Sequence, residues 1–328
     1  GYTRSLQSLV GPTMRTVITL VSLGLAGLAP FLAEPAALPV AHAPTHAAPA
    51  DQDDPSPIRR EAVAGSVHVL FGEGGNVGAS VGDDGVLLVD AQFHYMVDGL
   101  LASVAELTDA PPSFLVNTHW HGDHVGGNAR LGRAGAVIVA HDNVHGRMAR
   151  DHVLAVDGRD VPAYPTEAQP VISYDERASL HLNGDTLRVH HVPRAHTDGD
   201  SIVHWEGADV VHMGDTFFNG FYPFIDPNSG GHIDGMVAAA DLVLAFADED
   251  TRIIPGHGPV GGVADLRAYR DMVATVSERL ARHIADGKTD EQIVAAKPTA
   301  DLDEVWGDGF LSPDRFVTIV LQGLRRNG

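Results

Sequence analysis

The sequence predicts an α/β (α+β) fold in which β-sheets are packed between helices. Short apolar runs bounded by glycine or aspartate, such as 85–90 and 135–140, are typical of buried strands. They alternate with segments such as 96–107 and 262–286, whose apolar residues recur at helical spacing. Apolar residues make up 44 % of the 328 residues, enough to bury a substantial core in one large domain or two small ones.

The expected elements follow one another along the chain without an internal repeat. Strands are expected at 66–71, 79–82, 85–90, 114–116, 135–140, 179–182, 185–192, 201–205, 208–213 and 251–255. Helices are expected at 96–107, 128–133, 142–152, 234–248, 262–286 and 314–324. Asn183 and Gly184 between two of these strands predict a two-residue hairpin turn. Thr289 and Gln292 form a capping-box pattern, which predicts the start of one more helix.

The amino-terminal segment has the composition of a secretory signal peptide. Met14 and Arg15 give a charged start, and the apolar run at 16–29 is short for a membrane span. The small residues from Ala41 to Ala43 are a candidate cleavage site. We therefore expect an exported protein, periplasmic or secreted, with no stable membrane insertion after cleavage. An uncleaved membrane anchor is the alternative.

Three parts of the chain are expected from its composition. Residues 1–43 form an amino-terminal extension and the signal peptide, and residues 1–13 precede its apparent start. Residues 44–61 are rich in alanine, proline and aspartate, which is typical of a disordered linker. Residues 62–328 are expected to form the folded domain.

The charge balance and the absence of cysteine exclude several classes of function. The formal net charge is −21, from 22 basic and 43 acidic residues, and an acidic surface repels phosphate backbones. We therefore expect a small-molecule substrate and no nucleic-acid partner. The chain has no cysteine, which excludes disulfides, thiolate ligands and a cysteine nucleophile. Nothing in the sequence indicates the oligomeric state.

Four metal-ligand side chains lie within six positions directly after the apolar run at 114–116. His119 and His121 project to the same side of an extended segment, because side chains alternate there, and can hold one ion. Asp123 and His124 follow a bend at Gly122 and can hold a second ion. Imidazole nitrogens and carboxylate oxygens suit zinc and other divalent transition metals. A polar loop without a metal is the alternative.

Three further candidate ligands follow downstream, each at the end of an apolar run or between turn residues. His196 lies in a loop after the strand expected at 185–192, and His191 is a spare candidate beside it. Asp215 follows the strand expected at 208–213, where an ordinary turn aspartate is the alternative. His257 lies between two glycines after the strand expected at 251–255.

The pattern His119-x-His121-x-Asp123-His124 resembles the HxHxDH signature of the metallo-β-lactamase-fold hydrolases, and the likeness covers roughly 62–328. The resemblance implies a four-layer αβ/βα sandwich with two metal ions. It assigns His119, His121 and His196 to the first ion, and Asp123, His124 and His257 to the second. It makes Asp215 the bridge between them. Asp90, after the strand at 85–90, matches an aspartate that orients the ligands from behind, with a plain strand-end cap as the alternative.

The resemblance also implies the chemistry. Two divalent ions, most often Zn²⁺ with iron or manganese as alternatives, share a hydroxide that attacks the substrate. Asp123 can also transfer a proton to the leaving group. With an aspartate at the bridging position 215, the chain resembles the glyoxalase-II-like thioesterases, lactonases and phosphodiesterases more than it resembles the true zinc β-lactamases. We therefore expect cleavage of a small ester, lactone, thioester or amide, with at most weak β-lactamase activity.

Two other functions and the substrate pocket remain open at this point. One is a mononuclear-iron oxidoreductase of the persulfide dioxygenase type, and the other is a periplasmic metal-binding protein without catalysis. The aromatic segment 217–226 follows Asp215 directly and either walls a substrate pocket or packs on the core. Phe218, Tyr222 and His232 are the candidate pocket residues.

Overall fold

The computed structural model describes residues 57–154 and 159–326, and the side chains of 152–159 are not among the described ones. The predicted signal peptide, its cleavage site and most of the predicted linker at 44–61 lie outside the described residues. Within the described residues no helix is both long enough and apolar enough to cross a bilayer.

A seven-stranded sheet forms the amino-terminal half of the described part, in the order β1-β2-β3-β4-β5-β6-β9. Neighbouring strands from β1 to β4 are antiparallel, and β4, β5, β6 and β9 run parallel. The strands are β1 (Arg59–Ala64), β2 (Val67–Phe71), β3 (Val77–Gly82), β4 (Gly85–Val89), β5 (Pro112–Val116), β6 (Val137–His141) and β9 (Ile172–Tyr174).

A five-stranded sheet forms the carboxy-terminal half, in the order β10-β11-β12-β13-β14. Its first four strands are antiparallel and β13 pairs with β14 in parallel. A separate hairpin joins β7 (His152–Leu154) and β8 (Arg159–Val161). The strands of the five-stranded sheet are β10 (Arg177–Leu182), β11 (Asp185–Val192), β12 (Asp200–Trp205), β13 (Val210–His212) and β14 (Arg252–Ile254).

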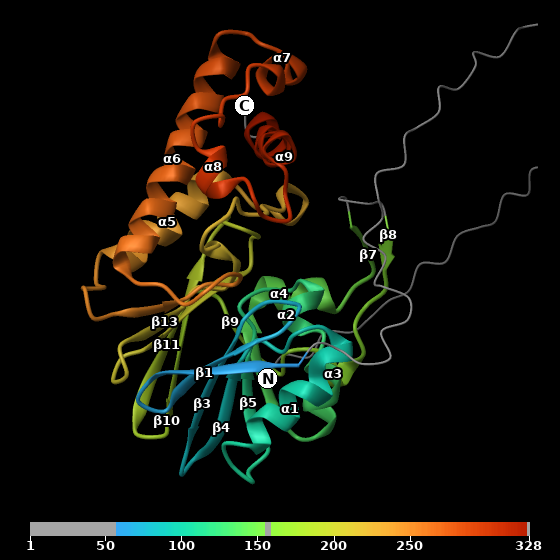
Figure 1. The fold of residues 1–328 in the computed structure, drawn as a ribbon. Coiled ribbons are helices and arrows are strands. Elements are labelled where there is room, and N and C mark those ends of the chain that lie inside the picture. The colour runs from blue at the N-terminus through green and yellow to red at the C-terminus, as the bar shows by residue number, and fades with distance from the viewer. Residues whose placement is uncertain (1–56, 155–158, 327–328) are drawn as a thin grey trace, which may run out of the picture. The chain divides into compact units, whose positions relative to one another are not determined.

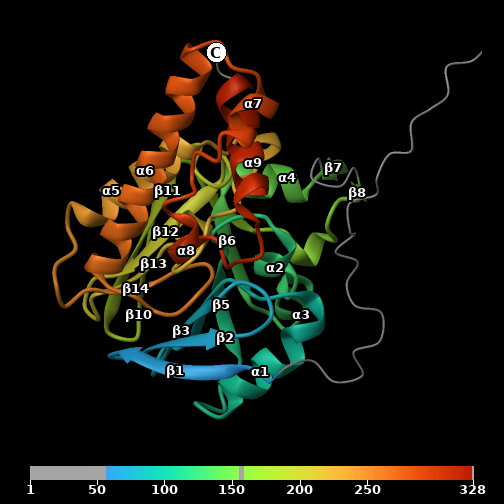
Figure 2. The same cartoon turned by 45° about the horizontal axis from the view of Figure 1, so that its top comes forward.

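Each sheet carries helices on its outer side, as Figures 1 and 2 show. The seven-stranded sheet is covered by α1 (Val97–Ala105), α2 (Gly122–Val125), α3 (Asn128–Arg133) and α4 (Asp142–Met148). The five-stranded sheet is covered by α5 (Ile233–Leu244) and α6 (Val263–Ala285). After α6 come α7 (Asp290–Ala295), α8 (Asp303–Trp306) and α9 (Pro313–Arg326), which share the apolar core of α5 and α6. Short 3-10 helices complete the chain at η1 (His94–Met96), η2 (Thr166–Ala168), η3 (Gly214–Thr216) and η4 (Pro227–Ser229).

The alternation of apolar residues along the strands builds three buried layers. In β4, Leu87 and Val89 face the second sheet, whereas Val86 and Leu88 face α1 and α3. The same alternation in the second sheet sends Trp205 between the sheets and Ile202 towards α5 and α6. The fold is therefore the four-layer αβ/βα sandwich that the sequence predicted.

Several strand assignments and helix boundaries differ from the prediction. β1 begins at Arg59, inside the segment predicted as linker. It was not expected, because its residues lie at the sheet edge and are only partly buried or exposed. β9, at the opposite edge, was not expected, because Tyr174 is its only buried residue. The helix predicted at 142–152 ends at Met148, and the chain then enters the hairpin of β7 and β8.

Candidate metal centre

The loop with the first four candidate ligands lies at the carboxyl end of β5, between β4 and β6. Buried Leu115 and Val116 hold the end of this strand in the core. The backbone N–H of Asn117 donates to the carbonyl of Val139 over 3.0 Å, and the N–H of Ser201 donates to that of Thr118 over 2.8 Å. Hydrogen bonds from both sheets therefore fix this loop at the strand end where open α/β sheets place their sites.

His119, His121 and His196 form the first ligand group. Nε2 of His196 lies 2.8 Å from Nδ1 of His121. The ring of His119 is centred 4.9 Å from that of His121 and 4.6 Å from that of His196. His196 comes from the loop between β11 and β12, so the group exists only once the two sheets have packed together.

Asp123, His124 and His257 form the second ligand group. Oδ2 of Asp123 lies 3.4 Å from Nε2 of His124 and 3.2 Å from Nε2 of His257. His257 follows β14 and is held by an isolated bridge to Phe218, in which the N–H of Asn219 donates to the carbonyl of His257 over 3.0 Å.

Asp215 lies in η3, after β13, and presents one carboxylate oxygen to each group. Its Oδ1 lies 3.1 Å from Nε2 of His124 and 3.4 Å from Nε2 of His257. Its Oδ2 lies 3.5 Å from Nε2 of His196 and 3.9 Å from Nε2 of His119. All seven side chains predicted as ligands therefore meet in one place, with Asp215 between the two groups.

Hydrogen bonds on the outer ring nitrogens aim the free lone pairs of three imidazoles into the site. Nδ1 of His196 donates to the carbonyl of Phe224 over 2.8 Å, and Nε2 of His121 donates to Asp226 over 3.1 Å. Nδ1 of His124 donates to Asp90 over 2.7 Å. The facing nitrogens of His121 and His196 are then both acceptors, which a cation between them can satisfy.

Asp90 organises the metal loop from behind, as the sequence predicted. It is fully buried, and its two oxygens accept from the backbone N–H and the hydroxyl of Thr118, each over 2.7 Å. Since that hydroxyl donates to Asp90, it accepts from Nδ1 of His119, 3.1 Å away. Asp90 thus sets the orientation of His124 directly and that of His119 through Thr118.

Several buried atoms of the site lack a hydrogen-bond partner within the described residues. They are Nε2 of His119, Nε2 of His124 and Oδ1 of Asp215. Buried polar atoms are nearly always paired, so an unpaired set that converges on one place indicates a missing partner. When a metal ion takes the place of the proton on His124, all of these atoms offer lone pairs of the type that binds divalent transition metals, and the residues present therefore fit a metal ion.

The charges of the site also favour a cation. Burial alone would raise the pKa of Asp215, but His124 and the other imidazoles lower it to well below its usual range. Burial would lower the pKa of His124, but Asp215, Asp123 and Asp90 raise it to well above 6.5. The three carboxylates therefore favour the protonated, positively charged form of buried His124. A bound metal ion would place positive charge at the same position.

A glycine-rich loop between β2 and β3 closes the site from the side. The N–H of Gly75 donates to the carbonyl of Asp123 over 3.2 Å, and a Cβ at Gly75 would overlap the ring of His124. The side-chain amide of Asn76 donates to the carbonyls of Pro255 and Gly258, each over 2.9 Å. This loop therefore packs against the second ligand group and fastens the turn that carries His257.

The comparison with known families agrees with this geometry. The family model described as the metallo-beta-lactamase superfamily matches residues 70–257, which include all seven candidate ligands. The chain belongs to the metallo-beta-lactamase superfamily. The resemblance seen in the sequence is thereby confirmed.

Two curated relatives of this superfamily member are hydroxyacylglutathione hydrolases. The one from Anaeromyxobacter dehalogenans is 34 % identical over 108 residues, which are 33 % of this chain and 33 % of the relative. The one from Polaromonas sp. is 30 % identical over 144 residues, which are 44 % of this chain and 47 % of the relative. The matches thus span about a third and about half of these relatives.

Solved structures of the superfamily share the fold. The DIM-1 metallo-beta-lactamase matches with a TM-score of 0.53 and 18 % identity, over 68 % of this chain and 99 % of that chain. A double mutant of the sec-alkyl sulfatase PisA1 matches with a TM-score of 0.58 and 17 % identity, over 82 % of this chain and 50 % of that chain. At this identity the likeness shows the fold alone.

The candidate pocket residues have different surroundings. Phe218 is fully buried and stacks on His257, with ring centroids 5.3 Å apart, so it supports a candidate ligand rather than lining an open pocket. Tyr222 does not line a pocket, because it is 1 % exposed, stacks on Phe316 and donates its hydroxyl to Asp303 over 2.8 Å. His232 caps α5 by accepting from the N–H of Asp234.

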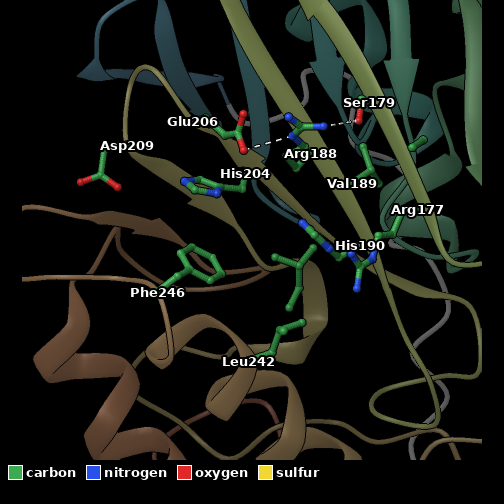
Figure 3. A pocket seen from close by; sticks show the side chains of 12 residues that line it. Arg177, Ser179, Arg188, Val189, His190, His204, Glu206, Asp209, Leu242 and Phe246 are labelled. Carbon is green, nitrogen blue, oxygen red and sulfur yellow. Dashed lines mark hydrogen bonds and ion pairs between the residues drawn. The ribbon is translucent and has the colours of Figure 1, made fainter.

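Two other histidine-bearing features lie apart from the ligands. His191, the spare candidate, is outside the ligand groups found among the described residues and stacks on His141, with centroids 3.6 Å apart. A cavity of about 470 Å³ lies over β10, β11 and β12 and is lined by Arg177, His190 and His204 beside Phe246 (Figure 3). None of the seven candidate ligands lines it.

Sequence reasoning missed the partners of the ligands on the carboxy-terminal side. Asp226 holds His121, and the carbonyl of Phe224 holds His196. The only local signal is Asp226 before Pro227, which predicts a helix start, and Asp226 does accept from the N–H groups of Asn228 and Ser229. Asp226 also orients the imidazole of His121, 105 positions away, and no local sequence pattern predicts this contact.

Proposed function

We propose that this chain is a hydrolase that uses two divalent metal ions, zinc first among them, to cleave a small ester, lactone, thioester or amide. The observation that carries the proposal is the position of Asp215, whose two oxygens face two separate ligand groups. Each group, together with one of these oxygens, can hold one ion. The names of the two curated relatives describe hydrolysis of an acylglutathione, which supports thioesters as one substrate class.

The residues of the site would bind the metal ions, leave one side open to the substrate and transfer a proton to the leaving group. Divalent ions at this site would lower the pKa of water and stabilise negative charge on the substrate oxygen. The side chains of His257 and Asp123 are 23 % and 21 % exposed, whereas that of His124 is fully buried. A substrate therefore approaches on the side of Asp123, and Oδ2 of Asp123 is placed to pass a proton to the leaving group.

The arrangement favours two ions over one. A single iron, as in the persulfide dioxygenase alternative, needs only one group of ligands. Here Asp123, His124 and His257 form a complete second group, with unpaired Nε2 of His124 at its centre. Asp226 and Asp90 orient one imidazole in each group, so both groups are built for binding.

Elemental analysis followed by a substrate panel tests this proposal. We expect about two divalent ions per chain and turnover of at least one ester, lactone, thioester, amide or β-lactam. Asp215→Ala and His119→Ala should each lower turnover by more than about a hundredfold, because loss of an outer partner alone costs 10–100-fold. Retained activity in either variant, or oxygen uptake with a persulfide at one iron per chain, contradicts the proposal. A metal-loaded protein that is inert towards the whole panel supports the non-catalytic alternative.

We also propose that the protein is exported, on the basis of the charged start at Met14, the apolar run at 16–29 and the small residues that end at Ala43. The test is expression from Met14 in a Gram-negative host, followed by fractionation and mass spectrometry of the intact chain. We expect a shortened chain outside the cytoplasm. A full-length chain in the cytoplasmic fraction contradicts export.

A further inference from the structure

Aromatic rings border the metal centre on the side of His257. Phe218 stacks on His257 at an interplanar angle of 15°. The ring of Phe310 is centred 6.1 Å from that of Phe218 and 6.4 Å from that of His257. The ring of Phe221 is centred 5.8 Å from Phe218 and 5.9 Å from Phe310. We call Phe218, Phe221 and Phe310 the aromatic rim.

Phe310 is held at this place although more than half of its surface is exposed. A hydrogen bond joins the segment before Phe310 to the loop after Asp215: the N–H of Tyr222 donates to the carbonyl of Trp306 over 2.9 Å. Gly309 packs so closely on Phe221 that an added Cβ would lie 2.7 Å from the Cβ of Phe221. Phe310 nevertheless remains 56 % exposed. An exposed apolar ring, fixed beside a partly exposed metal ligand, is typical of a surface that a ligand covers.

The ligands have no basic partner that would hold an anionic substrate. Within residues 57–154 and 159–326, the hydrogen bonds and ion pairs of the seven ligand side chains involve no lysine or arginine. Asp123 has an acidic neighbour instead, because Glu73 precedes Gly74, where an added Cβ would lie 2.9 Å from the Cβ of Asp123. The carboxylate of Glu73 accepts from the hydroxyl of Tyr95 over 3.0 Å. The surroundings are thus apolar beside His257 and acidic beside Asp123.

We propose that the aromatic rim binds the apolar chain of a neutral substrate, and that Phe310 sets the preference for chain length. This inference rests on the proposed hydrolase function. An apolar chain that lies on Phe310 and Phe221 removes their exposed surface from water, while the reacting carbonyl stays beside His257 and Asp123. A chain with a charged end would gain nothing from these rings.

The test measures kcat/KM of the metal-loaded protein on three series of neutral substrates with chains of two, four, six and eight carbons. The series are p-nitrophenyl esters, γ-alkyl lactones and N-acetylcysteamine thioesters. In each series that is turned over, we expect kcat/KM to rise roughly two- to fourfold per added methylene until the rim is covered. In Phe310→Ala the rise should disappear, with the two-carbon substrate changed less than about twofold. Phe310→Leu should restore most of the rise.

Phe246→Ala is the matched control, because Phe246 is 45 % exposed and lies in the cavity of Figure 3. It should keep the dependence on chain length. Absence of turnover in all three series and on the amides and β-lactams of the substrate panel overturns the proposed function itself. Turnover that does not depend on chain length, or an equal loss in Phe310→Ala and Phe246→Ala, overturns only the role of the rim.

A binding measurement on the metal-free protein provides a readout without turnover. Saturation-transfer NMR with 1-octanol should show contact between its terminal methyl and the protein. The signal should fall about threefold or more in Phe310→Ala and stay unchanged in Phe246→Ala. An unchanged signal in Phe310→Ala contradicts the inference, provided that circular dichroism shows the variant to be folded.

Discussion

At the scale of single residues, the site depends on a few side chains that orient the ligands rather than bind the metal. Asp90 has a backbone φ of 69°, in the left-handed region that non-glycine residues rarely adopt. This conformation places its carboxylate where it accepts from Thr118 and His124 at once. An uncommon backbone conformation is therefore maintained at a residue that serves the metal centre.

Replacing Asp90 with asparagine should weaken metal binding. Asparagine keeps the size of the side chain, but its amide group cannot accept from both Thr118 and Nδ1 of His124. We expect the affinity for zinc to fall by about 10–100-fold. Competition with a chelating dye measures it, and Asp241→Asn is the control, because Asp241 is exposed and pairs with Arg270. Equal affinities in the two variants would contradict the role of Asp90.

Two glycines at the candidate metal centre, one inside the loop 118–124 and one packed against it, give opposite predictions. Gly75→Ala would place a Cβ against the ring of His124, whereas Gly122→Ala meets no atom within 4 Å. Gly75→Ala should therefore lower zinc content by at least half, and Gly122→Ala should leave it unchanged. Elemental analysis of the two purified variants measures this difference. Full zinc content in Gly75→Ala would show that His124 can move aside without loss of the ion.

The side chains that converge on the candidate metal centre could be predicted from the sequence, and their surroundings could not. His119, His121, Asp123 and His124 form a dense local pattern, and each later ligand ends a strand or lies in a glycine turn. The partners of the ligands are distant in sequence or are backbone atoms, such as Asp226 and the carbonyl of Phe224. The sequence left the aromatic segment 217–226 open between a pocket wall and core packing, because it does not distinguish an aromatic side chain that packs inwards, as Tyr222 does, from one that faces a ligand.

At the scale of secondary structure, the strands of the sheet interiors could be predicted and two strands at the edges of the seven-stranded sheet could not. β4, β5 and β6 are apolar runs, because both of their faces are buried. The edge strands β1 and β9 carry exposed and partly buried residues without such a pattern. The hairpin at Asn183-Gly184 and the capping box at Thr289 were confirmed, since both depend on local chemistry.

The capping box gives a stability prediction that is independent of catalysis. The hydroxyl of Thr289 accepts from the N–H of Gln292, and the amide of Gln292 accepts from the N–H of Thr289. Thr289→Ala should lower the free energy of unfolding by about 1 kcal/mol. Thr275→Ala, at a partly exposed position of α6, should change it by less than about 0.5 kcal/mol. Urea titration measures both, and equal values would contradict the capping contribution.

At the scale of the whole described part, the metal centre lies where the two halves of the sandwich meet. His119 and His124 follow a strand of the seven-stranded sheet, whereas His196, Asp215 and His257 come from the five-stranded half. Ions held by both halves would bind the native chain and not the unfolded one. Metal binding should therefore stabilise the fold as well as supply chemistry.

Removal of the metal should lower the stability of the protein. With free zinc at one hundred times its dissociation constant, each site should add about 2.7 kcal/mol to the free energy of unfolding. Urea unfolding of the chelated protein, with and without added zinc, measures the gain. The same titration on Asp215→Ala should show a much smaller gain, and an undiminished one would place the zinc elsewhere.

The most direct test of the metal centre is anomalous diffraction from crystals of the zinc-loaded protein, collected on both sides of the zinc absorption edge. We predict two anomalous peaks about 3.5–4 Å apart. One should lie among His119, His121 and His196, and the other among Asp123, His124 and His257, with Asp215 in contact with both. A single peak, or peaks remote from these side chains, would contradict a two-metal hydrolase.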